Sequence, residues 1–259
     1  PIGLFAFNLL SITFFLIPSI IFFKNDTNRK LILISFISLF FLNYLYGNYI
    51  INKNDLNEKN LLDKKEFINI KIISPNFDLK YNLTEDEVLL RLKKLIKYSE
   101  IDKNKKTLFV WPEGSISGKY FFEIEKYKKV ISDNFFNNHK IILGSNTLNE
   151  NGNKFFNSFL IVDHKLNKDF QYNKIKLVPF GEFLPNSLFL EKIGLKKVTE
   201  GFGSFSEGKE QVSYLYENIK LNPLICYEII FPELTQNTDE KANFIVNISE
   251  DGWFGNSIG

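Results

Sequence analysis

The apolar positions divide the chain into two parts. Residues 1–23 and 31–51 contain no charged side chain, whereas apolar and polar positions alternate in short periods from residue 67 onward. At about 1.5 Å per residue, a helix over either uncharged run would be roughly 31–34 Å long, enough to cross a hydrocarbon layer of about 30 Å. We therefore expect transmembrane helices at 1–23 and 31–51 and a polar, Asn-rich linker over 52–66.

Two other interpretations of the uncharged runs are weaker. Buried helices of a soluble protein would usually keep a polar face, and neither run has one. A signal peptide would have a basic start and a shorter apolar run than 1–23. The connection Lys24–Lys30 holds three cations in seven residues, which predicts that this turn is cytoplasmic and that residue 52 onward lies on the other side of the membrane.

From residue 67 onward the periodicity predicts one α/β domain over 67–259. Residues 67–73 alternate and are rich in β-branched side chains, as in a strand. Thr84–Glu87 is a capping box that begins a helix with Val88, Leu92, Leu95 and Ile96 on one face. Further strands are expected at 107–111, 140–144, 158–162, 212–216, 223–226 and 244–248, and a second helix over 123–136. Strands and helices alternate at least through residue 144, which is typical of α/β domains.

Composition excludes several classes of site. The 32 basic and 30 acidic residues give a formal charge of +2, and no basic cluster interleaved with aromatic residues predicts a nucleic-acid partner. Cys226 is the lone cysteine, so an intramolecular disulfide is impossible. His139 and His164 belong to no motif, and we expect both at the surface and no zinc site. No glycine-rich phosphate loop is present, so no cofactor is expected.

The ends of the chain indicate an internal fragment. It begins at Pro1, contains no Met, and stops at Asn256–Gly259 directly after a motif. We expect the α/β domain to be incomplete at its C-terminus for this reason.

Three polar residues at the ends of apolar runs suggest acyl transfer. Glu113 follows Trp111-Pro112, Lys174 precedes the loop that ends at Glu182, and Cys226 ends Leu-Ile-Cys. In thioester chemistry a carboxylate takes the thiol proton, the thiolate attacks a carbonyl, and an ammonium stabilises the oxyanion. Each residue by itself would more often be a solvated glutamate, a surface lysine or an inert buried thiol; the combination points to catalysis.

The motifs resemble the nitrilase (carbon-nitrogen hydrolase) superfamily. The resemblance rests on Trp111–Gly114, Lys174–Glu182 and Pro223–Glu233, in that order. It implies an α-β-β-α sandwich with Glu113 as general base and Cys226 as nucleophile. It also implies that the catalytic lysine stands eight residues before the glutamate of Pro-Phe-Gly-Glu, which selects Lys174 and not Lys176.

The resemblance assigns supporting roles to residues near the catalytic trio. Glu182 would orient the lysine, Glu228 would support the same polar cluster, and the Tyr227 backbone N–H would be a second oxyanion donor. Trp253 and Phe254 would line an acyl pocket. Leu188, Phe189 and Leu190 belong to an apolar arm that would be costly to expose to water and that we expect against lipid.

Two segments, Leu177–Pro185 and Asn247–Gly255, narrow the resemblance to the apolipoprotein N-acyltransferases. That branch implies transfer of a fatty acyl chain from a membrane phospholipid, through a cysteine thioester, to the α-amine of a diacylglyceryl-cysteine apolipoprotein. It implies a monomeric, multi-pass protein of the bacterial inner membrane with a periplasmic catalytic domain and neither metal nor cofactor. Glu250 stands where Asn is common in the branch, and Pro75–Phe77 also departs from its pattern.

Two alternative functions share these features. A membrane-tethered nitrilase-type amidase would use the same trio but release its acyl group to water. A non-catalytic scaffold would only bind lipoproteins, and it would have no need of an intact Glu, Lys and Cys.

Overall fold

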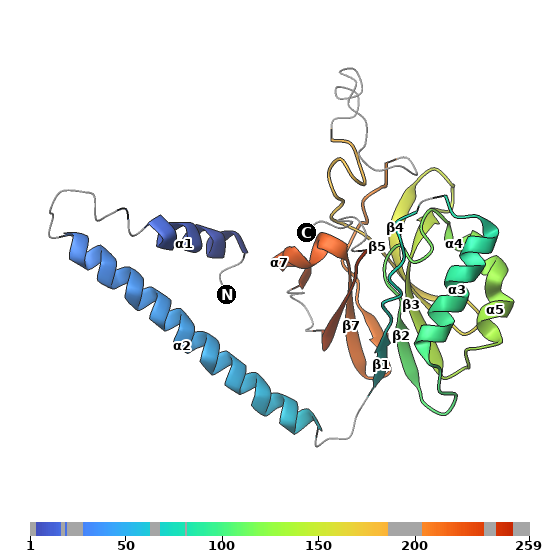
Figure 1. Cartoon of the computed structure of the whole chain (residues 1–259), viewed down its shortest axis with the longest axis horizontal. Helices are drawn as coiled ribbons and strands as arrows, with labels where there is room; N and C mark the ends of the chain where they lie inside the picture. The colour runs from blue at the N-terminus through green and yellow to red at the C-terminus, as the bar shows by residue number, and fades with distance from the viewer. Residues whose placement is uncertain are drawn as a thin grey trace. The chain divides into compact units, whose positions relative to one another are not determined.

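The computed structural model describes residues 4–16, 19, 28–62, 68–80, 82–185, 204–235 and 242–250. The chain divides into two compact units, residues 1–67 and residues 68–259 (Figure 1).

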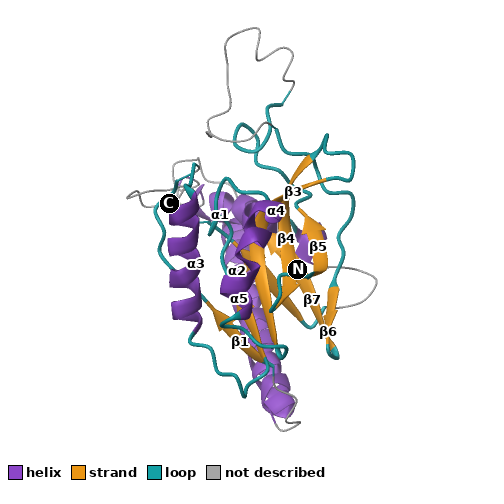
Figure 2. Cartoon of the chain, turned by 90° about the vertical axis from the view of Figure 1, so that its right-hand side faces the viewer, coloured by secondary structure: helices purple, strands orange, loops and turns teal. Residues whose placement is uncertain are grey.

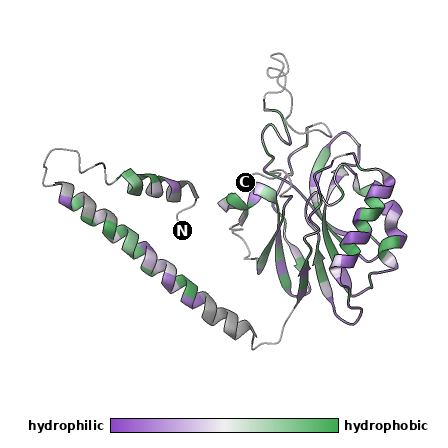
Figure 3. Ribbon diagram, viewed as in Figure 1, coloured by the Kyte–Doolittle hydropathy of each residue, from purple (hydrophilic) through white to green (hydrophobic). Residues whose placement is uncertain are grey.

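The N-terminal unit contains helix α1, Leu4–Leu16, and helix α2, Asn28–Leu62. The rings of Phe14 and Phe40 stack with centroids 5.2 Å apart. Both helices expose large apolar side chains, and Figure 3 colours many of their residues as hydrophobic. No helix among the described residues is both long enough and apolar enough to cross a membrane, so the spans expected at 1–23 and 31–51 are not shown. The bounds also differ from the expected ones, because α2 continues to Leu62 through the predicted linker. Lys, Glu and Leu in that segment favour a helix.

The larger unit is built on a five-stranded sheet in the order β1-β2-β3-β4-β5. Its strands are β1 Asn69–Ile72, β2 Thr107–Val110, β3 His139–Leu148, β4 Phe155–Asp163 and β5 Lys168–Asn173. The first three are parallel, and β4 and β5 continue the sheet antiparallel. β5 was not predicted, because its sequence, Lys-Asp-Phe-Gln-Tyr-Asn, is mostly polar and pairing with β4 determines its conformation.

Helices cover the outer face of this sheet. Helix α3, Glu85–Ser99, begins with the predicted capping box: the Thr84 hydroxyl accepts from the Glu87 N–H at 3.3 Å, and the Glu87 carboxylate accepts from the Thr84 N–H at 2.9 Å. Its buried face packs on a core that includes Phe109 and Trp111. In Figure 1, α3 lies on the same side of the sheet as the two short helices described next.

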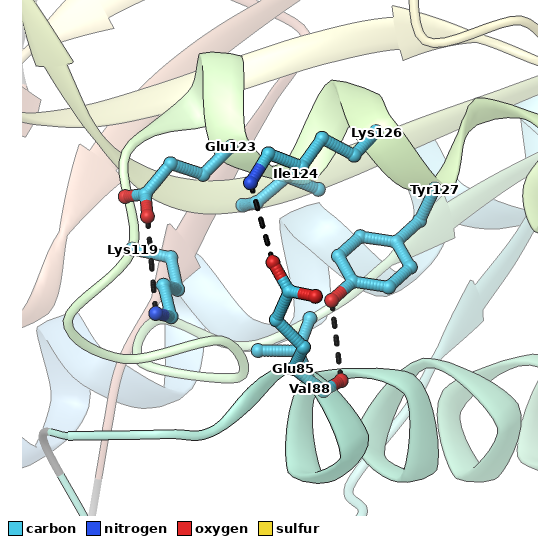
Figure 4. Close-up of a pocket in the computed structure, with 7 residues that line it drawn as sticks. All are labelled: Glu85, Val88, Lys119, Glu123, Ile124, Lys126 and Tyr127. Carbon is cyan, nitrogen blue, oxygen red and sulfur yellow. Dashed lines mark hydrogen bonds and ion pairs between the residues drawn. The ribbon is translucent and has the colours of Figure 1, made fainter.

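The helix predicted over 123–136 is not continuous. It is divided into α4, Phe121–Ile124, a 3-10 turn, Glu125–Tyr127, and α5, Lys128–Ser132. At the division the Tyr127 hydroxyl donates to the Glu85 carbonyl at 3.1 Å and Lys126 pairs with the Glu85 carboxylate at 3.3 Å (Figure 4). These contacts join the turn to the beginning of α3, and sequence periodicity does not report such tertiary contacts.

A second, three-stranded sheet packs on the inner face of the first. Its strands are β6 Tyr214–Tyr216, β7 Ile219–Ile225 and β8 Phe244–Ile248, with β7 and β8 parallel. Leu221, Ile225 and Val246 share a core with Val110 and Phe159 of the larger sheet. A 3-10 turn, Cys226–Ile230, and helix α7, Pro232–Thr235, follow β7. The described residues thus form the α-β-β part of the expected α-β-β-α sandwich (Figure 2).

The prediction that His139 lies at the surface is wrong. Its side chain is fully buried at the start of β3, where its ring packs edge-on against Phe109 at 5.3 Å. Nδ1 accepts from the Phe136 N–H at 3.1 Å, and Nε2 lies 3.1 Å from the Asp102 carbonyl. The imidazole ring thus holds the loop before β2 in place. This structural role explains why His139 is buried, and it requires no role in catalysis. His164 is partly buried in the turn after β4.

Candidate active site

The three predicted catalytic residues follow the ends of three strands. Glu113 comes just after β2, Lys174 directly after β5, and Cys226 directly after β7. Lys174 Nζ lies 4.0 Å from Glu113 Oε1 and 3.0 Å from Glu182 Oε1. The charges of Glu113 and Lys174 both act on the Cys226 thiol. The fold therefore gathers a buried ammonium and carboxylate next to a partly exposed thiol.

The two lysines of this loop have different environments. The Lys174 side chain is only 1% exposed. The Lys176 side chain is 37% exposed and pairs with Glu233 at 3.2 Å, outside the cluster. The register that selects Lys174 agrees with this placement.

Asn157, which the sequence analysis did not identify, joins the two carboxylates. Its Nδ2 donates to Glu113 Oε1 at 2.7 Å and to Glu182 Oε1 at 2.8 Å. The predicted strand 158–162 began one residue too late to include it. In the observed strand β4, Asn157 lies on the same face as Phe155 and Phe159. A polar residue between apolar residues on one face of a strand is the signal that could have revealed it.

Glu113 is poised to accept a proton. Burial raises the pKa of its carboxyl above the ordinary value, and Glu182 and Glu250 add to this, while Lys174 and the Asn157 hydrogen bond oppose it. Oε2 is buried and has no hydrogen-bond partner among the described residues. Because Oε1 is held by Asn157, Oε2 is the oxygen left to take a proton.

The pKa values of Lys174 and Cys226 are both raised, so the lysine is charged and the thiol is neutral before a proton is transferred. Burial lowers the pKa of Lys174, but Glu113 and Glu182 outweigh it, so the net pKa is raised and the side chain stays an ammonium. Burial and the Glu113 charge raise the pKa of the Cys226 thiol, and Lys174 lowers it without cancelling them. Lys174 lowers the pKa of the thiol, as expected, but this effect alone does not produce a thiolate. A neutral resting thiol needs a base.

Glu182 orients Lys174 from a tightly folded loop. Its Oε1 accepts from Lys174 Nζ, and its Oε2 accepts from the Val178 N–H at 2.8 Å. The backbone closes on itself, since the Glu182 N–H donates to the Val178 carbonyl at 2.8 Å. Phe180 adopts φ 63° within this turn, which a non-glycine residue adopts only when its surroundings enforce it.

Glu228 ties the lysine loop to the cysteine turn. Its side chain is fully buried. Oε1 accepts from the Tyr172 hydroxyl at 2.9 Å, the Ile175 N–H at 2.7 Å and the Lys176 N–H at 3.0 Å, and Oε2 accepts from the Ile225 N–H at 2.9 Å. These donors flank Lys174 on one side and Cys226 on the other. Glu228 therefore fixes the spacing between two catalytic candidates without touching either of their reactive atoms.

Cys226 lies in a strained turn at the end of β7. Its φ is 55°, in the left-handed region, which costs a non-glycine residue roughly 1–3 kcal/mol. The turn begins the 3-10 segment Cys226–Ile230 and leaves the side chain partly exposed. This is the sharp strand-to-helix exit that presents a nucleophile in other acyl-transfer folds.

The loop that carries Glu113 is held from its outer side. Arg91 on α3 is buried, and it donates to the Asp78 carbonyl at 2.6 Å and the Ser115 carbonyl at 3.3 Å. Gly114 has φ 67°, and a Cβ there would collide with the Glu250 carboxylate. Glu250, the residue that departs from the usual Asn, thus lies against this loop.

Several predicted residues lie outside the described part of the chain. These are Trp253, Phe254, Leu188, Phe189 and Leu190. Tyr227 is described, and its backbone N–H lowers the pKa of the Cys226 thiol. The Tyr227 hydroxyl lies 3.3 Å from the Leu177 carbonyl. Among the described residues no group of His, Cys, Asp and Glu could hold a metal ion.

Several known proteins are similar to this chain. The apolipoprotein N-acyltransferases of Rickettsia typhi and Rickettsia prowazekii are 31% and 28% identical to it, over 92% of this chain and 47% of their own length. The chain thus spans about half the length of the curated relatives it matches. Among solved structures, an amidase from Nesterenkonia sp. has a TM-score of 0.48 and 13% identity, covering 70% of this chain and 64% of that one.

The carbon-nitrogen hydrolase family covers most of the chain. It matches residues 70–259, a range that contains all the residues of the cluster around Lys174. The superfamily expected from the three motifs is therefore confirmed: the chain belongs to the carbon-nitrogen hydrolase family, and its curated relatives are apolipoprotein N-acyltransferases.

Proposed function

We propose that this chain carries the catalytic domain of an apolipoprotein N-acyltransferase that works through a thioester on Cys226. The observation that carries the proposal is the buried cluster of Glu113, Asn157, Glu182 and Lys174 beside the cysteine turn. The names of the relatives supply the acceptor class, an apolipoprotein; the phospholipid donor and the diacylglyceryl-cysteine acceptor are part of the proposal and rest on the resemblance described above.

In the first half-reaction Glu113 Oε2 takes the proton of the Cys226 thiol as sulfur attacks the ester carbonyl of a phospholipid. The Lys174 ammonium and the Tyr227 N–H stabilise the tetrahedral oxyanion. The intermediate expels the alcohol oxygen of a lysophospholipid, which receives the proton from Glu113. An acyl thioester on Cys226 and a lysophospholipid remain.

In the second half-reaction the neutral α-amine of the acceptor attacks the thioester carbonyl. Glu113 takes a proton from the attacking nitrogen, and the same oxyanion donors act again. Collapse of the intermediate forms the amide and releases the cysteine sulfur, which regains its proton from Glu113. Transfer to an amine and not to water requires that water be excluded from the thioester.

We propose a monomer in the bacterial inner membrane with the catalytic domain in the periplasm. The uncharged runs 1–23 and 31–51 and the cations of Lys24–Lys30 support this placement. Exposed apolar side chains on both N-terminal helices add to it, among them Phe15 at 79% and Leu31 at 66%. Leu188, Phe189 and Leu190, in the apolar arm, would contact the lipid that supplies the acyl chain.

The test is a product analysis with both substrates. The intact protein is incubated with phospholipid and a diacylglyceryl-cysteine peptide, and the products are identified by mass spectrometry. We expect acylated peptide and lysophospholipid in equal amounts. Free fatty acid in place of acylated peptide would indicate the amidase-type alternative, in which water is the acceptor. No turnover of either substrate would favour the lipoprotein-binding scaffold.

A further inference from the structure

The end of strand β8 lies beside the cysteine turn. The parallel pairing of β7 with β8 matches Leu224 with Asn247 and Ile225 with Ile248. Cys226 and Ser249 are the residues that directly follow this last pair. Within β8, Asn247 points to the side opposite to the core residues Val246 and Ile248.

Asn247 holds the strained backbone of the nucleophile. Its Nδ2 donates to the Cys226 carbonyl at 3.0 Å. A carbonyl fixed in this way keeps Cys226 in the left-handed conformation that its φ of 55° requires. The bond therefore determines the direction in which the thiol leaves the strand.

Ser249 acts on the sulfur itself. Ser249 directly follows β8 and Cys226 directly follows β7, the strand paired with it, and the Ser249 side chain, like Lys174 and the Tyr227 N–H, opposes the rise in the pKa of the thiol that burial and Glu113 cause. A hydroxyl that donates to a thiolate stabilises the charged form over the neutral thiol. Lys174 follows β5 of the five-stranded sheet and also interacts with Glu113 and Glu182. Ser249 follows β8, which belongs to the same three-stranded sheet as β7 and the cysteine turn.

We propose that Asn247 and Ser249 form a positioning pair for the nucleophile: Asn247 fixes the turn of Cys226, and the Ser249 hydroxyl donates to the sulfur when it becomes a thiolate. The pair deepens the function proposed above and rests on it for its purpose. It explains how a partly buried thiol with an adjacent carboxylate becomes reactive.

The test is the rate of alkylation of Cys226 by iodoacetamide as a function of pH. Cys226 is the chain's single cysteine, so the reaction reports one thiol and needs no acyl transfer. The matched pair is Ser249→Thr, which keeps the hydroxyl, and Ser249→Val, which has the same shape without it. Loss of a hydrogen bond to a charged group should raise the apparent pKa of alkylation by about one pH unit in Ser249→Val, with Ser249→Thr close to the wild type. Equal pH profiles for the Thr and Val variants would overturn the role of Ser249.

Asn247 is tested by comparison with an asparagine at the other end of β8. Asn243 Oδ1 accepts from the Lys220 N–H at 2.7 Å and so joins the same two strands away from the site. Asn247→Ala should reduce the maximal alkylation rate at high pH about tenfold per folded molecule, whereas Asn243→Ala should affect stability alone. Equal alkylation rates for the two folded variants would show that Asn247 only joins the strands.

These outcomes are separate from those of the proposed function. If the pH profiles behave as expected but no acylated peptide forms from phospholipid, the positioning pair stands and the acyltransferase assignment fails. If acyl transfer occurs with unchanged profiles, the assignment stands and the pair is withdrawn.

Discussion

Replacing Glu228 with Gln should weaken the fold and the site together. The carboxylate accepts from four donors, three on Oε1 and one on Oε2. An amide oxygen in place of Oε1 keeps three contacts but removes their charge, which costs about 1 kcal/mol for each bond. The amide NH2 would then face the Ile225 N–H and leave that buried donor without an acceptor, at a cost of about 1–3 kcal/mol.

Part of this cost is recovered, because the variant no longer buries a negative charge. We expect a net loss of about 3 kcal/mol in the free energy of unfolding. The relative displacement of Lys174 and Cys226 should also slow Cys226 acylation by roughly 10². Urea unfolding followed by tryptophan fluorescence measures the first quantity, and the rate of adduct formation measures the second.

Glu217→Gln is the control, because Glu217 is a glutamate at the surface: it pairs with Lys106, and the two side chains are 55% and 52% exposed. That change should cost less than about 1 kcal/mol. If Glu228→Gln is no more destabilising than Glu217→Gln and acylates at the wild-type rate, Glu228 does not tie the two loops together.

Three further predictions concern the lysine, the base and the topology. Lys174→Ala should slow acylation by roughly 10² to 10³, as expected for loss of an oxyanion donor, whereas Lys176→Ala should change it little; the reverse order would show that the register is wrong. Because burial raises the pKa of Glu113 above 4.5, acylation should fall as the pH drops through that raised value. A raised pKa means that the fold favours the protonated carboxyl, so the wild type loses stability as the pH rises through this pKa, whereas Glu113→Gln has no such loss. In urea unfolding, the variant should therefore compare less well with the wild type at low pH than at high pH. Cysteines introduced at Asn28 and Asn57 in a Cys226→Ala background should react with an impermeant maleimide from opposite sides of the inner membrane, and labelling of both from the cytoplasm would contradict the periplasmic assignment.

Local patterns predicted the elements that are stabilised by local contacts. The capping box at Thr84 and the apolar face of α3 appear where the sequence placed them. β5 and the division between α4 and α5 were missed, because the first depends on pairing with β4 and the second on contacts between Tyr127 and Glu85. His139 was misplaced for the same reason, since its burial depends on Phe109 and on the loop before β2.

The site followed a similar rule. Glu113, Lys174 and Cys226 were predicted because each stands in a motif; their catalytic roles stay a prediction, and the structure places Lys174 Nζ 4.0 Å from Glu113 Oε1. Asn157 was missed because its contacts depend on strand register: β4 brings it to the carboxylates of Glu113 and Glu182. The same holds for Asn247 and Ser249 of the proposed positioning pair, since the pairing of β8 with β7 brings them to the cysteine turn. Such contacts between strands cannot be predicted from the spacing of residues along the sequence.

The central claim is that Cys226 carries the acyl group, and intact-protein mass spectrometry tests it most directly. The protein is incubated with a phospholipid of defined chain length and no acceptor, then digested to locate the modification. The account predicts a mass increase of one acyl chain on the peptide that contains Cys226, removable by hydroxylamine and absent in Cys226→Ala. Phospholipid cleavage that proceeds without this adduct, or that persists in Cys226→Ala, would contradict the account.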